Sequence, residues 1–227
     1  MKCVILAGGK GSRISEISKK IPKPMISILG EPILIRIMKH YSKYGFKDFV
    51  IAAGYKKKVI ANFFKYKKFK DWNIKVVDTG LKTMTGGRIK RLKKFLNNQP
   101  FMLTYGDGLS DVNLKKLLNF HKKNKKIATL TAVRPPARFG AIKIKGSQVS
   151  YFKEKSKLDE GWINGGFFIL EPSIFKYIKG DQTFFEREPL QKISKLKSLC
   201  AYKHHGFWQC MDTLRDKEIL EKEIRKI

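Results

Sequence analysis

The segment LAGGKGSR, residues 6–13, places three glycines, a lysine and an arginine directly after a short apolar run. Glycines let the backbone approach a ligand closely, and consecutive N–H groups in such a loop can form an anion-binding surface. Lys10 and Arg13 would add positive charge to it. The segment matches neither the dinucleotide fingerprint nor the P-loop pattern, so taken alone it is either a phosphate-binding loop or a basic turn.

Three further residues are of types suited to phosphate chemistry. Lys23 lies between Pro22 and Pro24, and prolines on both sides restrict the backbone so that the lysine can be aimed. Asp107 follows an apolar run in TYGDG, and Asp212 precedes a helical pattern in MDTLRDK. The alternatives are a surface lysine, an ordinary Asp-Gly turn and a helix cap. The sequence alone does not show that the two carboxylates meet.

The elements that must position these residues follow from the apolar pattern. Over residues 1–133, short apolar runs alternate with segments of helical periodicity, which is typical of a parallel sheet with helices on both faces. In such sheets ligands bind beyond the carboxyl ends of the strands, where residues 6–13 and Asp107 are expected to lie. The expected strands are KCVILA, KDFVIAAG, NIKVVDTG, PFMLTYGDG and IATLTAV.

The pattern changes after Pro135-Pro136. GAIKIKG and QVSYFKE predict a β-hairpin around Gly146-Ser147, and WINGGFFIL predicts a further strand. Two short helices, a strand at LCAYKHHG and a helix at TLRDKEILEKEIRKI complete the chain. We therefore expect one α/β domain over residues 1–227, with a Rossmann-like, mostly parallel sheet flanked by helices and a small β-hairpin portion in the C-terminal half.

Composition restricts the class of protein. With 227 residues, 42% of them hydrophobic, the chain can form a core and is not disordered by composition. Three cysteines without C-x-x-C spacing favour a reducing compartment. The apolar run at residues 3–7 is too short for a signal peptide, and no stretch approaches the ~18 apolar residues of a membrane span. We therefore expect a cytoplasmic protein with no membrane partner.

The net charge of +30 admits two interpretations. It fits a protein that binds polyanions, nucleotides or an anionic membrane surface. However, most of the 49 basic residues are scattered lysines, as on a solvated surface, whereas specific phosphate recognition favours arginine. No RRM, KH, zinc-finger or helix-turn-helix pattern accompanies the charge, so we expect no nucleic-acid partner.

Taken together, the motifs resemble a known family. LAGGKGSR and PKPM resemble the nucleotidyltransferases that join a nucleoside triphosphate to a sugar 1-phosphate. The segments VDTG, MTGGRIKRL, TYGDGLSDVN, RPPARFGAI, WINGGFFILEPS, EREPL and GFWQCMDTLRDK then occur in order, as in the branch of that family that uses CTP and glucose 1-phosphate. The resemblance covers nearly the whole chain, and MTGGR, WINGG and the segment around MDTLRDK are the most specific to the branch.

The resemblance implies transfer of a cytidylyl group from CTP to α-D-glucose 1-phosphate, giving CDP-glucose and pyrophosphate. A phosphate oxygen of the sugar phosphate would attack the α-phosphorus in line, with Mg²⁺ held by carboxylates and phosphate oxygens. The product would feed deoxysugar synthesis for surface polysaccharides. Residues 1–133 would be the nucleotide-binding half, and residues 134–227, with the hairpin, the sugar-phosphate-binding half.

The resemblance also implies roles for individual residues. Arg13 and Lys23 would be the catalytic cations, and Asp107 and Asp212 the two metal ligands. The implied nucleotide-binding set is Leu6, Ala7, Gly8, Gly9, Lys10, Gly11, Ser12, Arg13, Lys23, Thr83, Arg88 and Gly106. The implied sugar-phosphate set is Glu154, Lys155, Asn164 and Gly165, with Gly166 in the same segment.

The sequence departs from the family pattern at Ser12, Ser156 and Cys210, and in a shortened segment before Lys75. The last departure bears on subunit contacts, and we expect a homo-oligomer of undefined subunit number.

Three alternative functions stay open. The protein could use another sugar 1-phosphate or another nucleoside triphosphate; it could be a catalytically silent sugar-nucleotide sensor; or it could be a polyanion-binding module that depends on the net charge.

Overall fold

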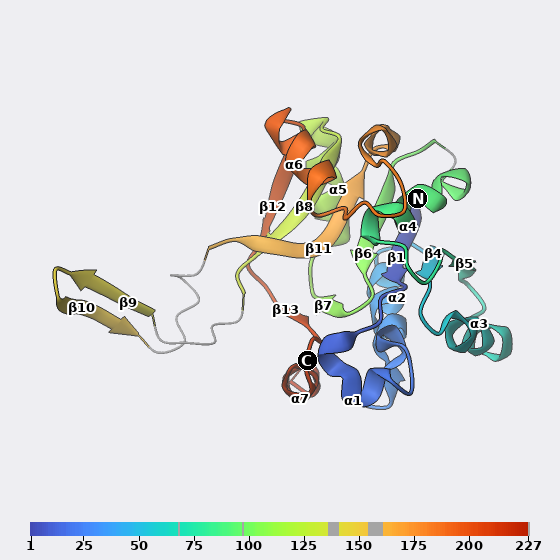
Figure 1. Ribbon diagram of the computed structural model, residues 1–227, viewed down its shortest axis with the longest axis horizontal. Coiled ribbons are helices and arrows are strands. Elements are labelled where there is room, and N and C mark those ends of the chain that lie inside the picture. Colours follow the sequence, from blue (N-terminus) through green and yellow to red (C-terminus); the bar gives the residue numbers. More distant parts are fainter. Residues whose placement is uncertain (68, 97, 136–140, 154–160, 227) are drawn as a thin grey trace.

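The computed structural model describes residues 1–67, 69–96, 98–135, 141–153 and 161–226 (Figure 1). A seven-stranded sheet forms its centre. The strands are β1 (Lys2–Ala7), β4 (Asp48–Ala53), β5 (Asn73–Asp78), β6 (Phe101–Tyr105), β8 (Ala128–Val133), β11 (Ile163–Leu170) and β12 (Leu199–His204). Their order across the sheet is β12-β8-β11-β6-β1-β4-β5.

The sheet is mostly parallel, as predicted, with one exception. β1 pairs in parallel with β4 and β6, β4 with β5, and β8 with β12. β11 runs antiparallel between β6 and β8. The strands predicted in residues 1–133 are confirmed, but the sequence did not predict the position or direction of β11. Strands from residues 134–227 therefore lie in the same sheet as those of residues 1–133.

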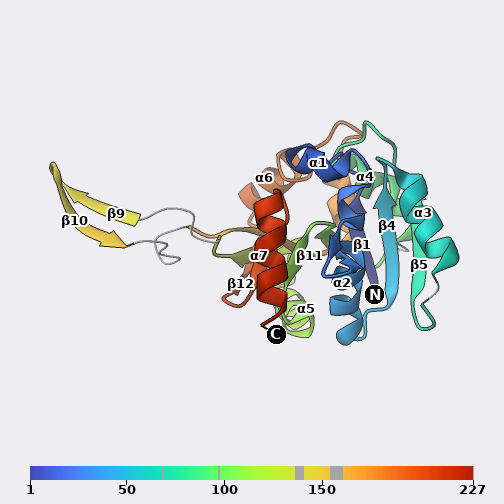
Figure 2. The same cartoon turned by 90° about the horizontal axis from the view of Figure 1, so that it is seen from below.

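Helices cover both faces of the sheet (Figures 1 and 2). On β1, Cys3 and Ile5 belong to one buried cluster, and Val4 and Leu6 belong to another, as the alternation of a strand requires. The first cluster includes residues of α2 (Ile33–Lys43), α3 (Lys57–Tyr66), α5 (Leu114–Asn124) and α7 (Leu214–Ile224). The second includes residues of α4 (Thr85–Arg91), α6 (Glu188–Lys195) and η4 (Pro172–Tyr177), and Phe95 of η3 (Lys93–Phe95) packs against it.

Several short elements lie around the carboxyl ends of the parallel strands, where the site is expected. η1 (Ser12–Ile14) and α1 (Ser15–Ser18) follow the glycine-rich loop, and η2 (Lys23–Met25) contains Lys23, one of the predicted site residues. β2 (Ser27–Ile28) and β3 (Glu31–Pro32) form one small ribbon. β7 (Gly108–Ser110) and β13 (Trp208–Cys210) form another, which the sequence did not predict.

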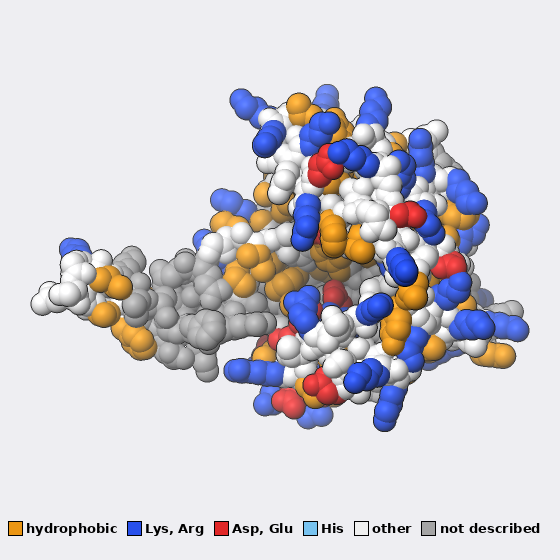
Figure 3. All heavy atoms as spheres, viewed as in Figure 1, with side chains coloured by type: hydrophobic (Ala, Val, Ile, Leu, Met, Phe, Trp, Pro, Cys, Tyr) orange, Lys and Arg blue, Asp and Glu red, His pale blue; other side chains and the backbone are white. Residues whose placement is uncertain are grey.

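The predicted hairpin is confirmed as β9 (Ala141–Lys145) and β10 (Gln148–Lys153), which pair antiparallel. It extends to one side of the body as an arm (Figures 1 and 2). Lysine and arginine side chains are scattered over the visible face of the body rather than gathered in one patch (Figure 3). Within the residues that the structure describes, no helix is long and apolar enough to cross a membrane.

Candidate active site

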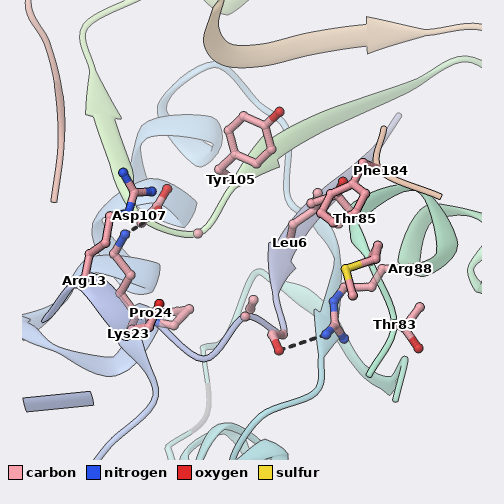
Figure 4. A pocket seen from close by; sticks show the side chains of 17 residues that line it. Leu6, Arg13, Lys23, Pro24, Thr83, Thr85, Arg88, Tyr105, Asp107 and Phe184 are labelled. Carbon is pink, nitrogen blue, oxygen red and sulfur yellow. Dashed lines mark hydrogen bonds and ion pairs between the residues drawn. The ribbon is translucent and has the colours of Figure 1, made fainter. Parts of the chain in front are cut away.

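The glycine-rich loop follows β1, the strand at which the strand order of the sheet reverses. β1 has β4 on one side and β6 on the other, and such a switch point opens a crevice beyond the carboxyl ends of the strands. A cavity of about 310 Å³ lies there, within the size range of small-molecule sites. Its lining includes the predicted residues Leu6, Ala7, Gly8, Gly9, Gly11, Ser12, Arg13, Lys23, Thr83, Arg88 and Gly106 (Figure 4).

Lys10, in contrast, is exposed and lies outside the lining residues of this cavity. Figure 4 shows that the cavity has two chemically different ends. Arg13, Lys23 and Asp107 lie at one end, and Thr83 and Arg88 lie at the other. One end therefore carries two cations and a carboxylate, and the other carries a hydroxyl and a guanidinium.

The two predicted carboxylates meet at one lysine. The Nζ of Lys23 lies 2.6 Å from Oδ2 of Asp107 and 2.7 Å from Oδ1 of Asp212. Arg13 Nη1 lies 2.7 Å from the other oxygen of Asp212. Lys23 is buried, whereas the side chain of Arg13 is 73% exposed and can reach toward a ligand. The structure thus brings together four residues that the sequence selected from four separate segments.

The charges in this cluster stabilise one another. Burial lowers the pKa of Lys23, but the charges and hydrogen bonds of Asp107 and Asp212 outweigh burial and raise it above its ordinary value. Burial raises the pKa of Asp212, but Lys23 and Arg13 outweigh burial and lower it. At neutral pH the lysine is therefore protonated and Asp212 is ionised.

A small ribbon sets the separation of the two carboxylates. Asp107 directly precedes β7 and Asp212 follows β13 by one residue, and Gly108 is the register partner of Cys210. The N–H of Met211 also donates to the carbonyl of Asp107, at 2.8 Å. Hydrogen bonds between the two backbones, rather than the side chains themselves, therefore hold the two acidic positions together.

This donor set fits a magnesium ion bound together with a nucleotide. Mg²⁺ is usually bound by one or two carboxylates plus phosphate oxygens and waters, and two carboxylates that already share one cation match that number. In the described ranges, no group of three or more His, Cys, Asp or Glu gathers as a dedicated metal cage. A metal at Asp107 and Asp212 would therefore need phosphate oxygens to complete its coordination.

Arg88 forms the floor of the other end of the cavity. Its guanidinium donates to the carbonyl of Gly8 at 2.9 Å, to the carbonyl of Gly80 at 2.7 Å and to the hydroxyl of Thr79 at 2.7 Å. Burial lowers its pKa. Arg88 therefore ties the loop after β1 to the loop after β5, and its predicted contact with a nucleotide stays a prediction.

Gly54, which the sequence reasoning missed, makes room for this arrangement. A Cβ atom at Gly54 would lie 2.4 Å from Nη1 of Arg88, 2.7 Å from the carbonyl oxygen of Gly80 and 2.9 Å from that of Gly8.

Gly54→Ala is expected to lower nucleotide affinity on the order of 10- to 100-fold, because displaced loops misplace the binding groups. Isothermal titration calorimetry with CTP, the nucleotide that the sequence resemblance implies, tests this. Gly180→Ala is the control, because its Cβ meets nothing within 4 Å; equal affinities in both variants would contradict the prediction.

The predicted sugar segment lies next to the cavity. The side-chain amide of Asn164 is 3.4 Å from the hydroxyl of Tyr105, and Trp208 donates to the carbonyl of Gly165 at 2.7 Å. Gly166 has φ +77°, and a Cβ there would lie 2.4 Å from the Tyr105 ring. Only glycine fits this position. Glu154 and Lys155 lie outside the described residues.

Sequence reasoning also missed a hydrogen-bonded wall of the cavity. Tyr105 and Thr85 line it, and their hydroxyls donate to the two oxygens of Glu186, both at 2.7 Å. Burial and the nearby Glu186 carboxylate raise the pKa of Tyr105, which keeps its proton as the donor. The available signals were the position of Tyr105 at the end of β6 and the acidic residue in EREPL.

Comparisons with known proteins identify the family of this chain. A family model described as nucleotidyl transferase matches residues 2–211. Glucose-1-phosphate cytidylyltransferase from Salmonella typhimurium is 47% identical, over 97% of this chain and 95% of the relative. D-glycero-alpha-D-manno-heptose 1-phosphate guanylyltransferase from Campylobacter jejuni is 35% identical, over 87% of this chain and 89% of the relative. The crystal structure of HddC from Yersinia pseudotuberculosis shares the fold, with a TM-score of 0.79 at 24% identity over 98% and 99% of the two chains.

The matched residues 2–211 begin with β1 and end one position before Asp212, so they include the cavity and most of the charged cluster. The similarity to the cytidylyltransferase extends over nearly the full length of both proteins. The chain therefore belongs to the nucleotidyl transferase family and is a nucleotidyltransferase.

Proposed function

We propose that this enzyme transfers a cytidylyl group from CTP to α-D-glucose 1-phosphate, forming CDP-glucose and pyrophosphate. The observation that carries the proposal is the cluster of Lys23, Asp107 and Asp212 at the charged end of a ligand-sized cavity. The higher identity to a glucose-1-phosphate cytidylyltransferase than to a guanylyltransferase supports the choice of substrates.

The two ends of the cavity suggest how CTP is oriented. The triphosphate would lie against the N–H groups of the loop at residues 8–12 and toward Arg13 and Lys23, and the base would lie toward Thr83 and Arg88. Arg13 is exposed enough to follow the phosphates, whereas Lys23 is fixed by its two carboxylates. The nucleotide-binding half over residues 1–133 is part of this proposal.

The chemical step is an in-line displacement at phosphorus. A phosphate oxygen of glucose 1-phosphate forms a bond to the α-phosphorus of CTP as the bond from that phosphorus to the bridging oxygen breaks, and pyrophosphate leaves. Arg13 and Lys23 would stabilise the negative charge on the transferring and leaving phosphates. Asp107 and Asp212 would hold Mg²⁺, which supplies Lewis-acid neutralisation of the phosphate oxygens when bound.

The sugar phosphate would approach from the side of β11. Asn164 and Gly165 lie beside Tyr105, which lines the cavity, so a sugar bound there would be next to the nucleotide. We propose that residues 134–227 form the sugar-phosphate half, with Glu154 and Lys155 as further contacts.

We also propose that the enzyme is cytoplasmic. Cys3, Cys200 and Cys210 are free thiols in the structure, which supports this location.

A substrate matrix tests the proposed function. The purified protein is incubated with Mg²⁺ and each of CTP, UTP, GTP and dTTP, in combination with glucose 1-phosphate and other sugar 1-phosphates. Pyrophosphate release and the mass of the nucleotide sugar are measured. We expect CDP-glucose from CTP and glucose 1-phosphate as the dominant product. A different preferred pair would support the alternative substrates, and no product from any pair would overturn the proposal.

We also propose that the enzyme is a homo-oligomer, with the arm as a contact between copies. Ile144, Val149 and Phe152 on the arm are 60%, 57% and 66% exposed, and exposed apolar side chains gathered on one element indicate an interaction surface. A double variant, Ile144→Asp with Phe152→Asp, is expected to lower the molar mass measured by light scattering after size exclusion. Lys145→Asp on the same arm is the control. A monomeric wild type, or a double variant of unchanged mass, would contradict this role.

A further inference from the structure

A second, buried carboxylate holds the turn that contains Asp212. Oδ2 of Asp216 accepts hydrogen bonds from the N–H of Asp212 at 3.0 Å, from the N–H of Thr213 at 2.9 Å and from the Thr213 hydroxyl at 2.9 Å. Asp216 is 4% exposed. Burying a carboxylate is unfavourable unless hydrogen bonds replace its water, so these three donors fix its position closely.

Helix capping explains only part of this arrangement. Thr213 is the N-cap of α7, its hydroxyl accepts from the N–H of Asp216 at 3.2 Å, and Asp216 accepts from the N–H of Thr213 in return. This reciprocal pair is a complete capping box. The N–H of Asp212 lies one residue before the N-cap, so its bond to Asp216 is not required by the helix and acts on the turn.

The same turn is bonded to its surroundings from the other side. Gln209 is 4% exposed, its side-chain amide donates to the carbonyl of Cys210 at 2.8 Å, and it lies 3.5 Å from Oδ1 of Asp216. The N–H of Met211 donates to the carbonyl of Asp107. Consecutive backbone groups are therefore fixed up to Asp212, whose side chain reaches Lys23.

We propose that Asp216 is a positioning residue for the Asp212 carboxylate. The inference rests on the proposed function, in which Asp212 is a metal ligand. By fixing the backbone of Asp212, Asp216 keeps that carboxylate where it and Asp107 can contact one cation. Partners that orient a metal ligand typically change metal affinity or activity 10- to 100-fold when they are removed. Asp216 lies beyond the residues 2–211 that the family model matches.

The test separates metal positioning from helix stability. Asp216→Asn keeps the size of the side chain but removes its charge. The matched control is Asn113→Ala, because Asn113 caps α5 through a single bond from the N–H of Lys116 at 2.9 Å. Both variants are expected to lower Tm by about 2–4 °C. Asp216→Asn alone is expected to raise the half-saturating Mn²⁺ concentration about tenfold in electron paramagnetic resonance titrations, and the half-saturating Mg²⁺ concentration for turnover likewise.

Two more variants make the outcomes distinct. Asp216→Glu keeps a carboxylate and the capping box but displaces the carboxylate by one methylene, so its Mn²⁺ affinity is expected to lie between those of wild type and Asp216→Asn. If Asp216→Asn fails to fold, a Mn²⁺ affinity of Asp216→Glu equal to that of Asn113→Ala overturns the inference. Mn²⁺ affinity of Asp216→Asn equal to that of Asn113→Ala overturns the inference and leaves the proposed function intact. Unchanged Mn²⁺ affinity in Asp212→Asn instead overturns the metal assignment, and this inference with it.

Discussion

Asp107→Asn and Asp212→Asn are each expected to lower Mg²⁺-dependent turnover on the order of 10³-fold or more, with the fold intact. In the proposed mechanism, each carboxylate contributes one negative charge toward a divalent cation held between phosphates. The two residues share the Lys23 ammonium, so each single variant leaves the buried lysine one carboxyl partner. The neutral amide keeps the size of the side chain, and the loss is therefore confined to charge.

Initial rates over a range of Mg²⁺ concentrations measure this effect, with circular dichroism and thermal melts to confirm folding. Asp111→Asn is a matched control, because Asp111 lies four positions after Asp107, is 57% exposed and pairs with His204 rather than with the cluster. Turnover in Asp111→Asn should stay within a few-fold of wild type. A comparable rate in Asp107→Asn or Asp212→Asn would contradict the ligand role of that residue.

Lys23→Met is expected to reduce kcat on the order of 10²- to 10³-fold, because it removes the fixed charge that we propose stabilises the reacting phosphates. Methionine keeps an unbranched side chain but leaves Asp107 and Asp212 facing each other without the shared ammonium. Two neighbouring carboxylates without a cation disfavour ionisation of one of them. Lys23→Arg is not expected to restore the rate, because a planar guanidinium differs in shape from an ammonium that bridges two carboxylates.

Steady-state kinetics at saturating Mg²⁺, varying CTP and the sugar phosphate in turn, separates the effect on kcat from the effect on KM. Lys19→Met provides the control, since Lys19 is exposed and lies in the same region of the sequence. A Lys23→Met enzyme with normal kcat and a raised KM for CTP would show that the lysine contributes to binding only. That result would remove Lys23 from the catalytic pair while keeping it in the nucleotide site.

Much of the fold could be predicted because local patterns report local geometry. The apolar runs of β1, β4 and β6 are buried on both faces, and such runs are recognisable without knowledge of their partners. The glycines and prolines of the loops at residues 6–13 and 22–24 mark special backbone conformations in the same way. These signals were sufficient to predict the position of the cavity at the strand ends.

The parts that could not be predicted depend on contacts distant in sequence. β7 and β13 have three residues each, too few for a periodic pattern, yet their pairing is what brings Asp107 and Asp212 together. The burial of Lys23 likewise depends on two acidic partners from other segments. The resemblance selected Arg88 as a nucleotide residue, but no sequence pattern shows that its donors are used by backbone oxygens.

The position of β11 has a consequence for how the chain folds. β8 ends at residue 133, yet both of its neighbours in the sheet, β11 and β12, come from residues 134–227. β6 also needs β11 to pair its second edge. An emerging chain that had reached only residue 133 would thus leave strand edges open, and sheet completion waits for long-range pairings that are slow to form. The two halves that we propose as units of substrate binding are therefore not independent units of folding.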